Sequence, residues 1–134
     1  MNAFGIFAAI LFLQAAMAYK DFKEESDWCI ERHGLSADKI YRIHRGGHLP
    51  STDDDYLTFI ECLWRKIRFL NSRGELNLAE IWGMYYEVAH EIYNHQVSAV
   101  KADAVLKKCK GVNGDTPALR AVNMGNCLKN VANY

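Results

Sequence analysis

The sequence predicts an all-α fold, a compact bundle of about six helices, and three observations support this prediction. After the first 18 residues, apolar side chains recur three or four positions apart in every long segment. No segment shows the strict alternation of apolar and polar residues that is typical of a half-buried strand. The chain has only two prolines and no internal repeat, so nothing divides it into further domains.

The N-terminal segment has the form of a secretory signal peptide. Residues 1–18, MNAFGIFAAILFLQAAMA, carry no charge, and Ala16-Met17-Ala18 matches an A-x-A cleavage site. A membrane anchor is the alternative, but the apolar run from Phe4 to Leu13 is shorter than the roughly 20 residues that span a bilayer. We therefore predict cleavage after Ala18, secretion, and one helical domain over residues 19–134.

Two helices are expected in the first part of this domain. The first is predicted over Tyr19 to His33, because Gly34 is a suitable residue for the left-handed position that ends many helices. The second is predicted over Ser36 to His44, with Ser36 as the N-cap, and it stops before Gly46.

A third helix is predicted over residues 56–70, where apolar residues form a broad face. Ser51 or Thr52 is expected to cap it, and Asp53, Asp54 and Asp55 would lie in its first turn, where negative charge suits the helix dipole. A calcium site is the alternative role of this acidic triplet. Three consecutive carboxylates lack the alternating spacing of a calcium loop, so we favour the capping role.

Three further helices follow. Asn77 to Glu80 has the form of a capping box, and the fourth helix is expected to extend to about Tyr93. The fifth is predicted over Ser98 to Lys108, and Thr116-Pro117 would start the last helix as N-cap and first helical residue.

The composition and motifs exclude several functions. The 16 basic residues balance 16 acidic ones, so no basic patch for nucleic acid is expected. No metal site is predicted from the histidines, which lack ligand spacing and are expected at the surface or at a pocket rim: His33, His44, His48, His90 and His95. No nucleophile motif or phosphate loop occurs, so we expect neither an enzyme nor a cofactor.

The four cysteines all follow the predicted signal peptide. They are Cys29, Cys62, Cys109 and Cys127. An even number of cysteines in a small secreted domain predicts disulfides, and four cysteines allow three pairings. The residues alone leave these three pairings open.

The cysteine spacing resembles that of the insect odorant-binding proteins. Members of that family usually have six cysteines, with the second four positions before the third and the fifth nine before the sixth. Here those two positions are Thr58 and Ala118. Since the two absent cysteines pair with each other in the family, the chain resembles its four-cysteine branch, known as C-minus.

This resemblance implies a pairing, a cavity and a function. Cys29 would pair with Cys62, and Cys109 with Cys127, around an internal apolar cavity. The chain would be a carrier that reversibly binds and transports a small hydrophobic molecule of odorant, pheromone or lipid type, with an odorant receptor or other membrane receptor as an indirect partner and a homodimer as an option. The expected cavity wall consists of Ile60, Leu63, Trp64, Ile67, Trp82, Tyr85, Ala89, Val105, Leu119, Val122 and Met124.

Two other functions stay open at this point. A scavenger of biogenic amines would need a carboxylate facing the pocket, and Glu61 is the candidate within the apolar run of the third helix. A secreted interaction protein would instead have a filled core and act through its surface. An exposed patch at Trp28, Tyr86 or Tyr93 would indicate this second function.

Overall fold

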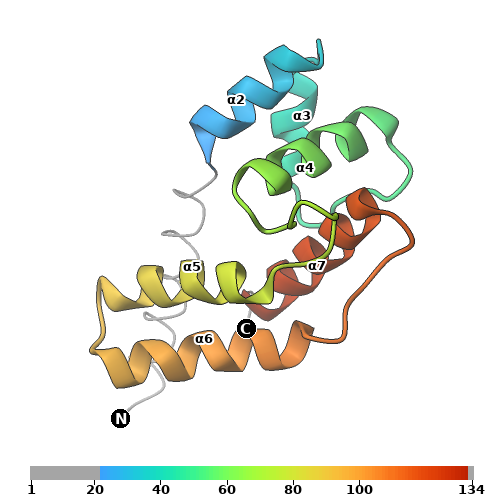
Figure 1. Cartoon of the computed structure of the whole chain (residues 1–134). Helices are drawn as coiled ribbons and strands as arrows, with labels where there is room; N and C mark the ends of the chain where they lie inside the picture. The colour runs from blue at the N-terminus through green and yellow to red at the C-terminus, as the bar shows by residue number, and fades with distance from the viewer. Residues whose placement is uncertain (1–21, 133–134) are drawn as a thin grey trace.

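The computed structural model describes residues 22–132, and the predicted signal peptide lies outside them. The described part folds into helices and contains no strand, only an isolated antiparallel bridge between Leu70 and Leu76. The all-α prediction is confirmed. No described helix has the length and apolar character needed to cross a membrane. The helices are α2 (Lys23–Arg32), α3 (Ala37–His44), α4 (Asp54–Lys66), α5 (Leu78–His90), α6 (His95–Cys109) and α7 (Pro117–Ala132) (Figure 1).

The helices form two groups, which contact each other through one pair of helices. Helix α4 packs against α7, α2 and α3, and this first group includes a contact between α2 and α3. Helices α5 and α6 form an antiparallel hairpin, which Figure 1 shows at the opposite end of the molecule from α2 and α3. The hairpin approaches the first group through the contact of α6 with α7.

The end of α2 follows the sequence prediction. Gly34 adopts the left-handed conformation with φ of 62°. The N–H of Leu35 donates to the carbonyl of Ile30 at 2.9 Å, and the N–H of Gly34 donates to that of Glu31 at 3.2 Å. These two bonds form a Schellman motif, which satisfies the last carbonyls of the helix and turns the chain toward α3. Ser36 then caps α3 as predicted, accepting from the N–H of Lys39 at 3.3 Å.

The start of α4 corrects one prediction. Asp53 is the N-cap, and its carboxylate accepts from the N–H of Tyr56 at 2.9 Å, so neither Ser51 nor Thr52 has this role. Asp54 and Asp55 lie in the first turn, as expected. An aspartate cap combines the hydrogen bond with a favourable charge at the helix dipole, which explains why the cap lies inside the acidic triplet.

Helix α4 is shorter than predicted. It ends at Lys66, and Arg68 takes a left-handed conformation with φ of 68°, so the chain leaves the helix before Leu70. Phe69 and Leu70 are nevertheless buried, because this turn directs both side chains back into the core. These two apolar residues fit the helical pattern because they are buried, but they reach the core from a turn. The pattern therefore overestimated the length of the helix.

The α5–α6 hairpin differs from the prediction at its turn. Asn77 caps α5 as predicted, accepting from the N–H of Glu80 at 3.4 Å, but α5 ends at His90 instead of near Tyr93. Asn94 caps α6 by accepting from the N–H of Val97 at 2.9 Å, so α6 begins three residues before the predicted Ser98. This cap was visible in the sequence as an asparagine ahead of a helical segment.

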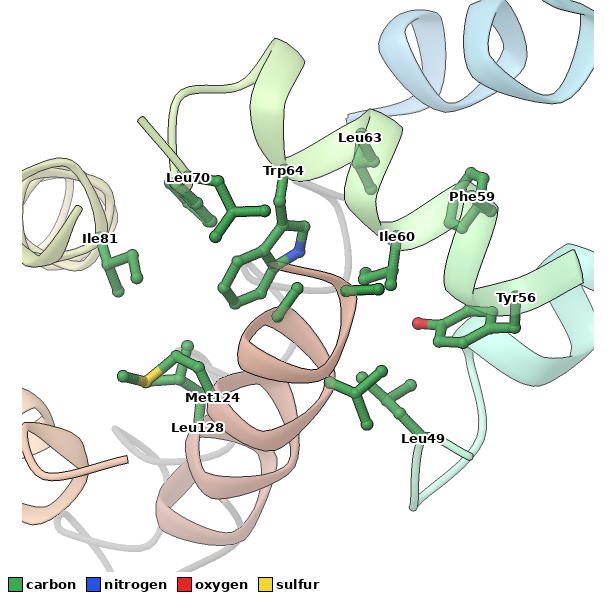
Figure 2. Packing of buried hydrophobic residues seen from close by; sticks show 14 of the residues in the cluster. Leu49, Tyr56, Phe59, Ile60, Leu63, Trp64, Leu70, Ile81, Met124 and Leu128 are labelled. Carbon is green, nitrogen blue, oxygen red and sulfur yellow. The ribbon is translucent and has the colours of Figure 1, made fainter. Parts of the chain in front are cut away.

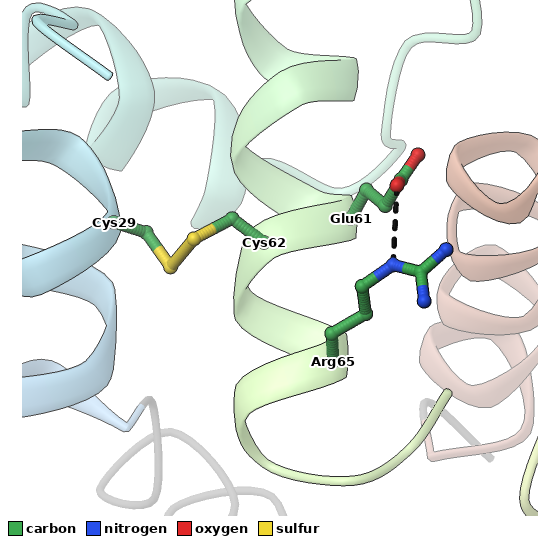
Figure 3. The surroundings of a disulfide bond; sticks show 4 residues. All are labelled: Cys29, Glu61, Cys62 and Arg65. Atoms are coloured by element: carbon green, nitrogen blue, oxygen red, sulfur yellow. Dashed lines mark hydrogen bonds and ion pairs between the residues drawn. A yellow bond between two sulfur atoms is a disulfide. The ribbon is translucent and has the colours of Figure 1, made fainter. Parts of the chain in front are cut away.

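Both disulfides implied by the family resemblance are present. Cys29 is bonded to Cys62 with an S–S distance of 2.10 Å, which links α2 to α4 (Figure 3). Cys109 is bonded to Cys127 at 2.06 Å, which links the end of α6 to α7. At the positions of the absent third bridge, Thr58 is exposed and Ala118 is buried.

Polar side chains of α7 strengthen its packing on the first helix group. Asn126 accepts from the N–H of Leu49 at 2.7 Å and donates to its carbonyl at 3.0 Å. Lys129 donates to the carbonyl of His44 at 3.2 Å, and Arg120 donates to that of Gly74 at 2.7 Å. Helix α7 is thus attached at both ends of α4 without a disulfide between these two helices.

The pH dependence of stability is expected to include a contribution from Asp53. The pKa of this carboxyl lies below 3.8. The main cause is the hydrogen bond from the backbone N–H of Tyr56, and the Lys39 side chain is a lesser cause. A lowered folded-state pKa stabilises the fold above about pH 4, and this contribution is lost as the pH falls through the lower value. Asp53→Asn should therefore flatten the fall in unfolding free energy as the pH decreases below about 4.

Denaturant titrations at several pH values measure this slope. Asp54→Asn is the matched control, because it removes a carboxylate from the same turn without touching the cap. Equal slopes for Asp53→Asn and the unaltered protein would contradict the prediction.

Candidate functional site

The predicted wall residues are all buried or partly buried. Seven of them are buried: Ile60, Leu63, Trp64, Tyr85, Ala89, Val122 and Met124. The other four are partly buried: Ile67, Trp82, Val105 and Leu119. Helical periodicity therefore selected residues that are buried or partly buried, although the buried face of α6 consists of Ser98, Ala102, Leu106 and Cys109. Burial does not by itself distinguish a cavity wall from a filled core.

The aromatic and apolar residues of α4 face α7 and α5. Figure 2 shows the Trp64 ring extending from α4 toward α7, with Leu70, Ile81 and Met124 around it. Phe69 meets Trp64 edge to face with ring centroids 5.3 Å apart. At α7, a Cβ on residue 125 would lie 2.8 Å from the Leu49 side chain, so glycine at this position permits close packing. Side chains from α4, α5 and α7 therefore meet in one apolar region.

Helix α5 is set back from this region. No Cα atom of α5 lies within 8 Å of a Cα atom of α4 or α7, although Ile81 and Tyr85 belong to the same hydrophobic core. Closely packed helices have axes about 8–10 Å apart, with Cα atoms about 2.3 Å from each axis, so many Cα pairs would lie nearer than this. The backbone of α5 is therefore not in close contact with α4 or α7, and its side chains Ile81 and Tyr85 reach the shared core.

Two polar groups in this region lack a protein partner. The side chain of Trp64 is only 6% exposed and that of Tyr85 only 8%, yet within residues 22–132 neither the indole N–H nor the phenol hydroxyl forms a hydrogen bond. By contrast, the hydroxyl of Tyr56 is 2.9 Å from Nδ1 of His44. Since no fully buried side-chain nitrogen or oxygen in the described part is unpaired, the polar atoms of Trp64 and Tyr85 both retain access to solvent-sized space.

Burial also affects the ionisation of Tyr85. Desolvation raises the pKa of its phenol above the ordinary value, so the hydroxyl keeps its proton at all physiological pH values. Tyr85 is therefore available as a hydrogen-bond donor, as is the Trp64 indole, which has no acceptor atom.

Trp82 also makes polar and stacking contacts within the α5–α6 hairpin. Its indole N–H donates to Asp103 at 2.8 Å, and its ring stacks on Tyr86 at a centroid distance of 5.2 Å. Tyr86 stacks in turn on His90, and its hydroxyl is 2.6 Å from Nδ1 of His95. This row of rings joins α5 to α6 along one edge of the hairpin. Because the indole N–H of Trp82 already donates to Asp103, it is not available to a ligand. In residues 22–132, no group of three or more histidine, cysteine or acidic residues is placed to hold a metal ion.

A separate groove lies on the surface between α2 and α4, beside the Cys29–Cys62 disulfide. It has a volume of about 630 Å³. Its lining residues are Trp28, Arg32, His33, Thr58, Glu61, Cys62, Arg65 and Lys66. No sequence pattern predicted this groove, but Trp28 was a candidate for surface exposure, and this residue is 49% exposed.

The position of Glu61 argues against the amine-scavenger alternative. Glu61 accepts from Nε of Arg65 at 3.2 Å at the surface groove (Figure 3). It lies outside the apolar region around Trp64, and Arg32 and Lys66 add positive charge beside it. A cationic ligand would be repelled by this surrounding charge.

Comparison with known proteins gives one match. The model of the PBP/GOBP family matches residues 14–131, which is most of the chain. No curated protein and no solved structure matches significantly.

Proposed function

The chain belongs to the PBP/GOBP family of small binding and carrier proteins, which are not enzymes, and from this premise we propose that it is a secreted carrier whose ligand site lies between α4, α5 and α7. The ligand would be a small hydrophobic molecule of odorant, pheromone or lipid type. Binding would be reversible, and transport would follow from release of the unchanged ligand.

The observation that carries this proposal is the pair of hydrogen-bond donors at Trp64 and Tyr85, which have no protein partner in the described part. Both polar atoms retain access to solvent-sized space, so an acceptor oxygen of a ligand could reach them. Ligand pockets typically combine apolar walls with a few polar groups that orient the ligand. The setback of α5 from α4 and α7 supports the same location.

The chemistry of these donors narrows the ligand class. Both groups donate hydrogen bonds at neutral pH, so they suit a ligand that accepts through a carbonyl, ester, hydroxyl or carboxyl oxygen. The remainder of the ligand would contact apolar side chains such as Ile60, Val122 and Met124, which favour an alkyl or terpenoid chain. Alcohols, esters, aldehydes and fatty acids all meet these two requirements.

A fluorescence titration tests the proposal. The oxidised, delipidated chain from Tyr19 onward would be titrated with an apolar fluorescent probe, followed by displacement with a series of long-chain alcohols, esters and fatty acids. Saturable one-to-one binding with competitive displacement is expected. Absence of binding by a protein with native circular dichroism would reject the carrier function.

Tyr85→Phe is expected to separate the polar contribution from the apolar one. Loss of the hydroxyl should weaken binding of an ester or alcohol about 5- to 10-fold, as expected for one hydrogen bond, while binding of the matching hydrocarbon stays unchanged. Displacement titrations with a matched ester and alkane pair would measure the difference.

Tyr93→Phe is the control variant, because Tyr93 lies in the turn between α5 and α6 and its hydroxyl also has no partner in the described part. Equal losses for ester and alkane in Tyr85→Phe would place the Tyr85 hydroxyl outside the binding site.

The exposure of Trp28 favours the surface-acting alternative as a second candidate. That function requires a filled core and no uptake of apolar probes. The titration therefore distinguishes the two functions directly.

A further inference from the structure

We propose that the surface groove between α2 and α4 is a second ligand site, which binds a small organic anion with an aromatic or alkyl group. The site is separate from the apolar region around Trp64 and Tyr85 and does not depend on the carrier function. Positive charge, an exposed ring and unpaired donors meet in this groove.

The groove has an excess of positive charge. Arg32, Arg65 and Lys66 line it together with one carboxylate, Glu61. Arg65 is already occupied, since it donates to Glu61 at 3.2 Å and to the carbonyls of Asn71 and Ser72 at 3.4 and 3.2 Å. Arg32 and Lys66 form no ion pair with any residue in the described range. Two cations are therefore available to an incoming anion.

These two cations flank an exposed aromatic ring. Arg32 lies one helical turn after Trp28, on the same face of α2. The ammonium group of Lys66 reaches across from α4 and lies 3.9 Å from the centroid of the Trp28 ring. The disulfide between Cys29 and Cys62 links the two helices, so the backbone positions that carry the ring and both cations are held close together.

The remaining features fit a small molecule. The Thr58 hydroxyl also lines the groove and is unpaired among residues 22–132, so it can donate a further hydrogen bond. A volume of about 630 Å³ lies within the usual range for small-molecule sites. A carboxylate or similar anion would accept from Arg32, Lys66 and Thr58, while its apolar part would lie beside the Lys66 ammonium against the exposed part of the indole.

The three tryptophans provide a test, because each indole N–H gives its own signal in a ¹H–¹⁵N NMR spectrum. Trp28 reports on the groove, and Trp64 reports on the internal region. The oxidised chain from Tyr19 would be titrated with 4-phenylbutyrate, 4-phenylbutanol and 4-phenylbutylamine, which share an apolar group and differ in charge. We expect the anion to shift the Trp28 signal in a saturable manner, and the alcohol and amine to leave it in place.

Charge variants identify the residues that bind. Arg32→Gln and Lys66→Gln should each weaken 4-phenylbutyrate binding at Trp28 about 5- to 10-fold. Lys107→Gln, an exposed lysine on α6, is the control and should change nothing. Tyr85→Phe should also leave this binding unchanged, which separates the groove from the proposed carrier site.

Three results would overturn the proposal. The first is a Trp28 signal that does not move, and the second is a shift of equal size with the alcohol. The third is binding of an acidic peptide without binding of 4-phenylbutyrate, which would assign the groove to a protein partner instead.

Discussion

Replacing Cys109 and Cys127 together with serine is expected to lower the free energy of unfolding by about 3 kcal/mol and to loosen the α5–α6 hairpin. The stability loss follows from the entropy of closing a loop with a sequence separation of 18 residues. The selective loosening follows from the fold, because α6 is the member of the hairpin that packs against α7, and this disulfide lies at that contact.

Denaturant unfolding measures the first effect, and hydrogen exchange measures the second. Amides of α5 and α6 should exchange faster in the double variant than those of α4. Cys29→Ser with Cys62→Ser is the matched control: it should also cost about 3–4 kcal/mol, but its faster exchange should appear in α2. The same exchange pattern in both double variants would show that the hairpin is not a separately anchored unit.

Ligand binding should respond to the same pair of variants. If the site lies between α5 and the α4–α7 pair, loosening the hairpin will weaken binding more than the loss of the Cys29–Cys62 bond does. Titration with the apolar probe, under conditions where both variants are folded, makes this comparison. Equal affinities would argue against a site at α5.

Phe59→Ala is expected to lower the free energy of unfolding by about 3–5 kcal/mol. Phe59 is fully buried on α4, and its ring lies 5.4 Å from that of His44 and 5.8 Å from that of Tyr56, between centroids. Removing it would leave a cavity beneath the hydrogen bond between Tyr56 and His44, at the joint between α3 and α4. Thermal or denaturant unfolding measures the loss.

The control for this substitution removes apolar atoms from the surface. Val100 on α6 is 66% exposed, so Val100→Ala should change stability by less than about 0.5 kcal/mol. Since Phe59 lies away from the groove, Phe59→Ala should leave the Trp28 signal of the folded protein in place. A loss below 1.5 kcal/mol would mean that the neighbouring rings collapse into the space.

Local sequence signals were most informative where a helix begins or ends on its own residues. Gly34, Ser36, Asn77 and Thr116 were each predicted to end or cap a helix, and each does so. A cap depends on a side chain and the backbone within a few residues of it, so the sequence contains the whole interaction. The start of α4 is the exception: the cap was predicted at Ser51 or Thr52, but Asp53, one or two residues later, has this role.

Contacts between residues far apart in the chain could not be predicted from local sequence signals. The residues alone left three disulfide pairings open, and only the family resemblance selected the one found. Phe69 and Leu70 fit the apolar pattern of a helix, but the chain turns at Arg68 and buries them from a loop. The pattern records burial, and several backbone paths can bury the same residue.

The sequence by itself determined the fold class, most of the helix caps and many of the buried positions, because these depend on periodicity and on contacts between near neighbours. Only the tertiary structure decided which polar groups in those faces remain unpaired, and it alone brought Trp28, Arg32 and Lys66 together across two helices. The spacing of α5 from α4 and α7 was likewise invisible in the sequence. Such features depend on the positions of helices relative to one another, which the whole core sets and no single segment encodes.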